Sequence, residues 1–297
     1  MISLRVLLQD FLQDFRYALR TMRQKPGFAA VALGTLALGA GATTVMFTVI
    51  DGVLLKPFAY RDPSRLVRLQ EQTDWSNQWG NLWAFTYPNF LDCKRESRSL
   101  EMAAWRIERG TISAPGVAEY VDGIEMSREL FPMLGVHVAP GRVFLPEEDR
   151  PGAAPVAIIS YGLWQRRFGG KAAAVGSKLV FDDKPYTVVG ITPAGFKLDD
   201  AEFDVFTPIN QDTSPAMQNR GAHGFRVWAR LRGGTTLAQA QAELAVAGRR
   251  LAAEYPKSNK GRTVTAELLR PDVGDVRSTL WLLLGAVSLV LLIACVN

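Results

Sequence analysis

Residues 28–50 read FAAVALGTLALGAGATTVMFTVI, a run of 23 residues without a charged side chain. At about 1.5 Å per residue, a helix of this length spans about 35 Å, which exceeds the ~30 Å hydrocarbon core of a bilayer. A buried core helix is the alternative interpretation, but such helices seldom stay free of charge for so long. The run therefore predicts a transmembrane helix at residues 28–50, preceded by a short segment and followed by a long one.

A second uncharged run, STLWLLLGAVSLVLLIACVN, occupies residues 278–297 at the other end of the chain. Its 20 residues are long enough to form most or all of another transmembrane helix. We interpret the run as the start of a second, truncated span, and we expect the reading frame to continue into further apolar spans.

The distribution of charge orients the first predicted span. The chain carries 34 basic and 29 acidic residues, a net charge of +5, and residues 1–27 account for +3 of it. Basic residues beside a span favour the cytoplasmic side of the membrane. The pattern therefore predicts a cytoplasmic N-terminus and places residues 51–277 outside the cytoplasm. The remaining charge is spread thinly over that segment, which argues against nucleic-acid binding.

The leader at residues 1–27 has the pattern of an amphipathic helix that ends at Pro26-Gly27. Its apolar residues recur at three- and four-residue spacing: Leu7, Leu8, Phe11, Phe15, Ala18, Leu19 and Met22. Such a helix suits the inner membrane surface or a cytoplasmic partner, and a plain topogenic leader is the alternative. Ala40-Gly41-Ala42 has the form of a signal-peptidase site, but the long charged leader and the apolar run that continues past this site favour an uncleaved anchor.

One face of the first run carries small residues that would permit close packing against another span. They are Ala37, Ala40, Gly41 and Thr44. The abundance of Ala and Gly in the run is an equally good explanation of this pattern.

The segment at 51–277 is long enough for a sizeable core, and 48% apolar, 10% aromatic and 21% charged residues argue against disorder. The segment begins with strand-like alternation at 67–71, a helical stretch at 89–97 and a strand at 101–106. The same strand–helix–strand order returns near its end. There, a strand at 225–231 precedes a helix that begins with the capping box Thr236–Gln239 and ends at Pro256, and alternation returns at 263–268. Two βαβ-like halves far apart in sequence therefore predict one subdomain.

The middle of the segment, about residues 111–210, has a different pattern of predicted elements. Short β-rich pieces at 117–126, 156–159, 178–181 and 186–191 alternate with short helical pieces at 128–134 and 161–168. This pattern predicts an inserted α+β subdomain. No low-complexity tract, charge block or strict repeat interrupts it.

Sequence templates for catalysis fail in this chain, and we expect no catalytic, cofactor-binding or metal-binding residues. Gly170–Lys178 has the wrong spacing for a phosphate-binding loop, and Ser160 lacks the first glycine of a nucleophile elbow and is expected to cap a helix. His137 and His223 are isolated and are expected to be surface or hydrogen-bonded histidines. The acidic run Glu147–Asp149 is expected to be a solvated loop rather than a glycosidase pair.

The two cysteines, Cys93 and Cys295, fall in different predicted environments, so a disulfide between them is not expected. Cys93 lies in the segment placed outside the cytoplasm. We expect a membrane-impermeant maleimide to label it from that side.

Eight motifs in this order closely resemble those of MacB/FtsX-type ABC transporter permeases, in particular the duplicated acidobacterial-type permeases. They are VLLKPF (53–58), DPSRLV (62–67), YPNFLD (87–92), LFPMLGV (130–136), PGRVF (140–144), LWQRRFGG (163–170), YTVVGITP (186–193) and LLIACVN (291–297). Each is weak alone, but their combination is specific and covers essentially the whole chain.

The resemblance implies a periplasmic core domain of α+β class at 51–277, with a Porter-like part at 60–110 and 220–272 and a Sabre-like insert at 111–215. It also implies a non-enzymatic permease, in the bacterial inner membrane, that forms a dimer with a second permease copy. A separate ABC ATPase at the cytoplasmic face would drive it, and a periplasmic adaptor or outer-membrane protein is a further expected partner.

Three functions remain open at this stage. The first is the permease half of an ABC export or efflux system that works by mechanotransmission, moving its periplasmic domains. The second is an FtsX-like regulator that signals to an envelope hydrolase or a lipoprotein pathway. The third is an anchored periplasmic scaffold without an ATPase.

Overall fold

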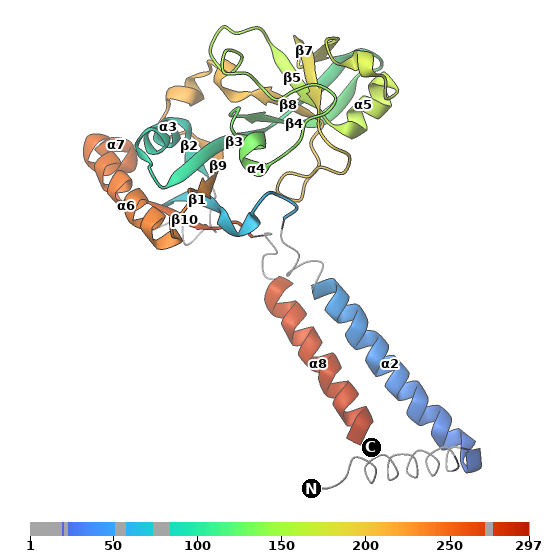
Figure 1. The fold of residues 1–297 in the computed structure, drawn as a ribbon. Helices are drawn as coiled ribbons and strands as arrows, with labels where there is room; N and C mark the ends of the chain where they lie inside the picture. Colours follow the sequence, from blue (N-terminus) through green and yellow to red (C-terminus); the bar gives the residue numbers. More distant parts are fainter. Residues whose placement is uncertain (1–19, 21–22, 51–57, 74–83, 271–275, 297) are drawn as a thin grey trace. The chain divides into compact units, whose positions relative to one another are not determined.

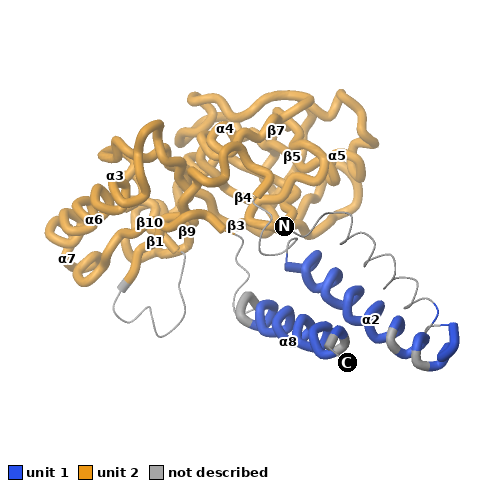
Figure 2. Tube along the Cα trace, turned by 60° about the horizontal axis from the view of Figure 1, so that its bottom comes forward, with its two compact units in different colours: residues 1–57, 271–297 blue, residues 58–270 orange. Residues whose placement is uncertain are grey.

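The computed structural model describes residues 20, 23–50, 58–73, 84–270 and 276–296, which belong to two compact units (Figures 1 and 2). One unit comprises Met1–Pro57 and Pro271–Asn297, and the other comprises Phe58–Arg270. Most of the predicted leader lies outside the described residues, so its amphipathic helix stays a prediction.

The smaller unit contains two apolar helices, α2 (Pro26–Ile50) and α8 (Val276–Val296). A break at Lys25 precedes α2, and the fixed φ of Pro26 suits the first position of a helix. Among the described residues, α2 is the one helix long and apolar enough, over Ala29–Ile50, to cross a membrane. The apolar stretch of α8, Thr279–Ile293, is shorter.

The two helices pack against each other through Gly39 of α2, where a β-carbon would lie 2.9 Å from Cδ1 of Leu291. The glycine thus permits the close approach. A β-carbon added at Gly41 would have no neighbouring atom within 4 Å, and Ala37 is exposed. The face predicted from spacing is therefore not the one that meets α8, because two residues along a helix turn the contact by about 200°.

Hydroxyl groups of α2 are satisfied within the helix itself. Oγ1 of Thr43 donates to the carbonyl of Gly39, and Oγ1 of Thr44 donates to that of Ala40, each at 2.8 Å. Such bonds suit a helix in hydrocarbon, where no water is present to accept them.

The larger unit begins with an antiparallel sheet in the order β10-β1-β9-β3. We call this part the open-sheet lobe. Its strands are β1 (Leu66–Thr73), β3 (Leu100–Ala114), β9 (His223–Leu231) and β10 (Arg262–Leu268), and β2 (Phe85–Thr86) pairs with the start of β9. Its helices are α3 (Tyr87–Glu96), α6 (Leu237–Glu254) and α7 (Pro256–Asn259).

The open-sheet lobe consists of two interleaved strand–helix–strand units, β1-α3-β3 and β9-α6-β10. The two strands of each unit are parallel, because both are antiparallel to the strand between them. This is the split βαβ arrangement. The lobe draws on both ends of the segment, as the sequence predicted, and α3 and α6 contact the same face of the sheet (Figure 1).

The chain between β3 and β9 folds into a second part, which we call the barrel lobe. Here β3 pairs with both β4 and β6, and the remaining pairs β4–β8, β8–β5, β5–β7 and β7–β6 close the ring. The elements are β4 (Glu119–Met126), α4 (Leu130–Leu134), β5 (Val156–Ile159), α5 (Tyr161–Phe168), β6 (Lys178–Phe181), β7 (Lys184–Ile191) and β8 (Val205–Pro208).

Strand β3 belongs to both lobes. Its first half pairs with β9 in the open sheet, and its second half lies in the barrel. The boundary that the sequence placed between residues 110 and 111 therefore falls inside a continuous strand. The two lobes share a backbone ladder rather than a linker.

Three apolar clusters fill the larger unit. The helix-side cluster lies between the open sheet and α3 and α6, and includes Phe90, Met102, Ala104, Val227, Leu244 and Val264. The root cluster covers the opposite face of the sheet and includes Phe58, Tyr60, Leu66, Trp105, Trp228 and Leu269. The barrel interior includes Ile112, Val121, Phe181, Val188 and Val205.

Two strand glycines make room inside the barrel for Phe181. A β-carbon at Gly110 would lie 2.9 Å from its ring, and one at Gly123 would lie 2.9 Å from the carbonyl oxygen of Glu108 and 3.1 Å from the ring. Larger side chains there would displace the ring or the strand backbone. This explains why the glycines interrupt otherwise regular strands.

Candidate functional site

Both ends of the larger unit meet at one place. The amide of Leu269, after the last strand, donates to the carbonyl of Leu66, at the start of the first strand, over 2.8 Å. Phe58 and Leu269 lie in the same apolar cluster. The segments that lead toward α2 and α8 are therefore fastened side by side. We call this place the root: residues 58–66 and 268–270 with the side chains that hold them.

Arg230 on β9 is the central polar residue of the root, and its side chain is only 5% exposed. Its Nε and Nη2 atoms both donate to the carbonyl of Met133, at 3.0 and 2.8 Å. Nη2 also donates to the carbonyl of Arg61, and Nη1 donates to that of Asp62 at 3.2 Å. One guanidinium thus joins the incoming segment to the end of α4 and to the central sheet.

The charge of Arg230 is compensated mainly by backbone dipoles. Burial lowers the pKa of its guanidinium, and the neighbouring charge of Arg61 lowers it further. The Asp62 carboxylate, 3.9 Å from Nη1, opposes this shift. Arginine still keeps its proton at neutral pH, and its planar fork of five donors can reach three carbonyls at once, which the single ammonium of lysine cannot do in the same geometry.

Aromatic rings fix the incoming segment on the same face of β9. The Phe58 and Tyr60 rings stack at 5.1 Å, and both lie within about 6 Å of the Trp228 ring. The Tyr60 hydroxyl donates to the carbonyl of Lys197 at 3.0 Å and accepts from the amide of Asp199 at 3.1 Å. Burial raises the pKa of Tyr60 well above its ordinary value, so the hydroxyl stays neutral and can donate.

The turn after α4 is shaped to receive this segment. The amide of Arg61 donates to the carbonyl of Leu134 at 2.9 Å. Gly135 follows with φ +74°, and a β-carbon on it would lie 2.7 Å from Cβ of Arg61. Both the left-handed backbone and the close contact require glycine here. Arg65 adds a hydrogen bond from Nη2 to the carbonyl of Leu231.

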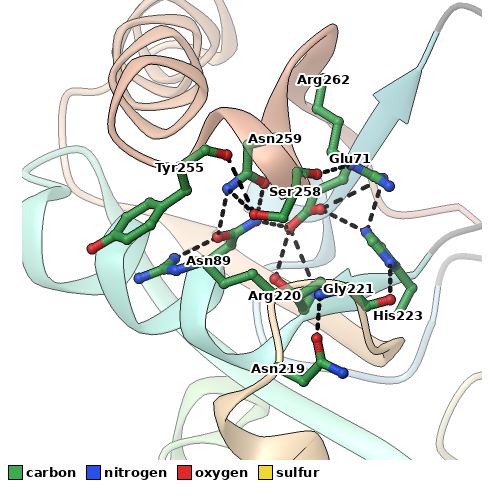
Figure 3. A network of polar contacts seen from close by, with 11 residues as sticks. Glu71, Asn89, Asn219, Arg220, Gly221, His223, Tyr255, Ser258, Asn259 and Arg262 are labelled. Atoms are coloured by element: carbon green, nitrogen blue, oxygen red, sulfur yellow. Dashed lines mark hydrogen bonds and ion pairs between the residues drawn. The ribbon is translucent and has the colours of Figure 1, made fainter.

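A second polar group, the Glu71 network, lies at the other end of β1 (Figure 3). The Glu71 side chain is 1% exposed, and its Oε1 accepts from Nδ2 of Asn89 at 2.9 Å and from the amide of Thr86 at 3.3 Å. Nδ2 of Asn89 also donates to Oδ1 of Asn259 at 2.8 Å. The buried carboxylate therefore connects β1, β2, α3 and α7.

Arg220 extends the Glu71 network toward α3. Its Nη1 donates to Oδ1 of Asn89 at 2.6 Å, its Nη2 donates to Oδ2 of Asp92 at 2.7 Å, and its guanidinium lies 3.6 Å from the centre of the Tyr255 ring. These contacts pin the turn before β9 to the helices.

The two histidines differ in their surroundings. His223 belongs to the Glu71 network: Nε2 lies 2.9 Å from Oε2 of Glu71 and 2.9 Å from Nη1 of Arg262, and Nδ1 lies 3.1 Å from the carbonyl of Gly221. It is thus a hydrogen-bonded histidine, one of the two possibilities that the sequence left open. His137 is exposed.

Two expectations need correction. Glu148 and Asp149 are not a solvated loop: Glu148 forms a two-bond pair with Arg142, whose hydrogen bonds lower the pKa of the carboxyl. Asp149 accepts from the amides of Arg128 and Asn210. Both residues fasten loops.

Cys93, expected to react with maleimide, is buried on the inner face of α3. Burial raises the pKa of its thiol to about 12, and the nearby Glu71 carboxylate contributes to the rise. The folded protein therefore protects this thiol from a reagent that needs the thiolate.

Ser160 caps α5, accepting from the amide of Leu163 at 2.9 Å, as the sequence predicted. The described part of the chain contains no group of three or more His, Cys, Asp or Glu side chains that could hold a metal ion. Neither the root nor the Glu71 network was predicted from the sequence. Arg230 lies at a polar position of an alternating strand, and Glu71 lies on the strand face of Val67 and Leu69, where an apolar residue is expected.

Comparisons with known proteins agree with this fold. The family model for the MacB-like periplasmic core domain matches residues 29–247. The periplasmic region of MacB from Actinobacillus actinomycetemcomitans is similar with a TM-score of 0.53 at 11% identity, over 78% of this chain and 95% of that one. A domain of a permease protein from Porphyromonas gingivalis gives a TM-score of 0.56 at 13% identity, over 74% and 98%. No curated protein matches in sequence.

The Arg230 contacts lead to a stability prediction. In Arg230→Met, three buried carbonyls lose their donor, so we expect the free energy of unfolding to fall by about 2–5 kcal/mol. The control is Arg109→Met on β3, whose side chain is 59% exposed in a surface pair with Asp122, and which should cost less than about 1 kcal/mol. Chemical denaturation of the full chain in detergent, followed by tryptophan fluorescence, measures both. Equal, small losses would show that the root does not depend on Arg230.

Proposed function

Because the chain belongs to the MacB-like periplasmic core domain family, we propose that it is the domain-bearing N-terminal part of an ABC transporter permease that works by mechanotransmission. In this function a cytoplasmic ATPase moves the membrane helices, and the helices move the extracytoplasmic domain for export or efflux. The chain itself performs no catalysis. Its contribution is to connect two membrane helices to a folded domain.

The observation that carries this proposal is the root. The chain enters and leaves the domain at adjacent points, and both points are bonded to the sheet: Leu269 to Leu66, and Arg61 and Asp62 to Arg230. A displacement of either connection is therefore transferred to β9, the strand that pairs with both β1 and β3. A domain tethered only by flexible linkers would not receive such a displacement.

The proposed location follows from charge and apolar length. The basic leader favours a cytoplasmic N-terminus, and α2 is long enough to span the inner membrane, which leaves residues 58–270 on the periplasmic side. The apolar helix α8 then returns toward the cytoplasm as the start of the second span. The expected partners are an ABC ATPase at the cytoplasmic face, a second permease copy, and a periplasmic adaptor or outer-membrane protein.

Cysteine labelling tests the location. In a variant with Cys93 and Cys295 replaced by serine, we place a single cysteine at Val117, which is 85% exposed, or at Gln24, just before α2. A membrane-impermeant maleimide should label Val117→Cys in intact spheroplasts and Gln24→Cys only after permeabilisation. The opposite pattern would overturn the proposed orientation.

Cross-linking tests the ATPase. A cross-linker attached to Gln24→Cys in the native membrane should capture a protein with an ABC ATPase sequence, identified by mass spectrometry, and the same reagent at Val117→Cys should not. ATPase capture with an envelope hydrolase or lipoprotein partner at Val117, and no solute transport, would favour the FtsX-like regulator. Absence of any ATPase at Gln24 would favour the anchored scaffold.

A further inference from the structure

The face of β3 that is apolar at both ends carries charges in its middle. Met102 and Ala104 belong to the helix-side cluster, and Ile112 belongs to the barrel interior. Between them, on the same face, lie Arg106 and Glu108. The joint between the open-sheet lobe and the barrel lobe is thus polar on this face, although the strand itself is continuous.

Three carboxyl groups converge on one guanidinium at this joint. Nε of Arg106 lies 2.5 Å from Oε2 of Glu125, and Nη2 lies 2.6 Å from Oδ2 of Asp212. Arg106 and Glu125 are directly opposite in the β3–β4 ladder, and Glu108 is opposite Gly123, so Glu108 and Glu125 are diagonal neighbours on one face. The Glu125 side chain is only 10% exposed.

Of the two carboxyl groups that accompany Glu125, Asp212 has several hydrogen-bond donors. Asp212 accepts from the amide and hydroxyl of Ser214 as well as from Arg106, and these contacts lower its pKa although burial opposes them. Asp212 therefore stays ionised and retains Arg106. Because Asp212 neutralises part of the positive charge of Arg106, only the rest of that charge is left for Glu108 and Glu125.

Burial and, after it, the charge of Glu108 raise the pKa of Glu125 to about 8, and Arg106 offsets only part of the rise. Two neighbouring carboxyl groups that compete for one guanidinium do not both ionise cheaply, which favours a proton on this pair. Tyr186 on β7 and Tyr87 on α3 also lie near Glu125, and Nζ of Lys184 lies 5.1 Å from the centre of the Tyr186 ring. Burial raises the pKa of both tyrosines well above the ordinary value, so they stay neutral.

We propose that Glu108 and Glu125 form a proton-binding joint between the two lobes. With the proton bound, the acid of one side chain donates to the carboxylate of the other and holds β3 and β4 together at the joint. Without the proton, two adjacent carboxylates repel each other and the ladder loosens there. The coupling between the root and the barrel lobe then depends on the pH around the domain, and this last consequence rests on the proposed function.

The sign of the pH dependence follows from linkage. The pKa of Glu125 rises from an ordinary 4.5 to about 8 in the folded protein, so the folded state holds a proton that the unfolded state releases between these values. Stability from the joint is fully present below about pH 4.5 and is lost as the pH rises through about 8. The unfolding equilibrium constant should grow by up to about tenfold per pH unit in this window.

Denaturation of the full chain in detergent from pH 5 to 9 tests proton binding. Glu125→Gln mimics the protonated side chain, so its stability should lack the decline with pH that the wild-type protein has. Glu267→Gln, in an ion pair with Arg68 in which the glutamate side chain is 42% exposed, should keep the decline. Comparison of variants under identical conditions cancels the contributions of the other titrating groups. An unchanged decline in Glu125→Gln would overturn the proposal.

Hydrogen exchange tests the loosening. At pH 9, amides around residues 106–110 and 121–125 should exchange severalfold faster in the wild-type protein than in Glu125→Gln, and at pH 6 the two proteins should match. Equal exchange at pH 9 would contradict the joint. Where Glu125→Gln fails to fold, infrared spectra of the wild-type protein test directly for a protonated carboxyl group. A carboxylic-acid band seen at pH 6 should vanish by pH 9. In Glu108→Gln the same band should vanish at a lower pH. An absent or unshifted band would refute proton sharing.

Discussion

The guanidinium of Arg230 binds three backbone carbonyls in the interior of the root, and much of the larger unit is arranged around it. Its strand, β9, pairs with β1, β2 and β3, while its hydrogen bonds hold the incoming segment and the end of α4. A buried cation among carbonyl dipoles is stable only while every donor keeps its acceptor. The segments that supply these acceptors are therefore constrained together, and the stacked rings of Phe58 and Tyr60 exclude water beside them.

Through this constraint, a displacement of the root can pass into the rest of the domain. The connection toward the membrane helices is bonded to β9, β9 is bonded to β3, and β3 continues into the barrel lobe without a linker. The Glu71 network bonds the opposite end of β1 to α3 and α7. On the face of β3 that carries Arg106, charged side chains lie between the two lobes, while on the opposite face the root cluster packs apolar residues of both lobes together.

Local features of the fold were predictable from sequence, and long-range ones were not. The capping box at Thr236 is confirmed, because cap chemistry depends on four consecutive residues. Closure of the barrel depends on the pairing of Ile112 with Phe181, nearly 70 residues apart, for which the sequence has no signal. Arg230 occupies a polar position of an alternating strand, a pattern that normally marks a solvated face, and Glu125 shares its strand face with the buried Val121. Burial of such residues is decided by tertiary packing, so both sites emerged only from the structure.

The central claim is that the two segments of the root, residues 58–66 and 268–270, are part of the rigid domain. Hydrogen exchange of the full chain in lipid nanodiscs tests it most directly, through the amides of Arg61 and Leu269, which donate to Leu134 and Leu66. The account predicts that these amides exchange as slowly as those in the middle of β9, and that Arg230→Met accelerates exchange at Arg61 while the barrel strands β6 and β7 are unaffected. Exchange at the rate of an open loop in the wild-type protein would contradict the claim, because a loosely held root could not carry a displacement into the domain.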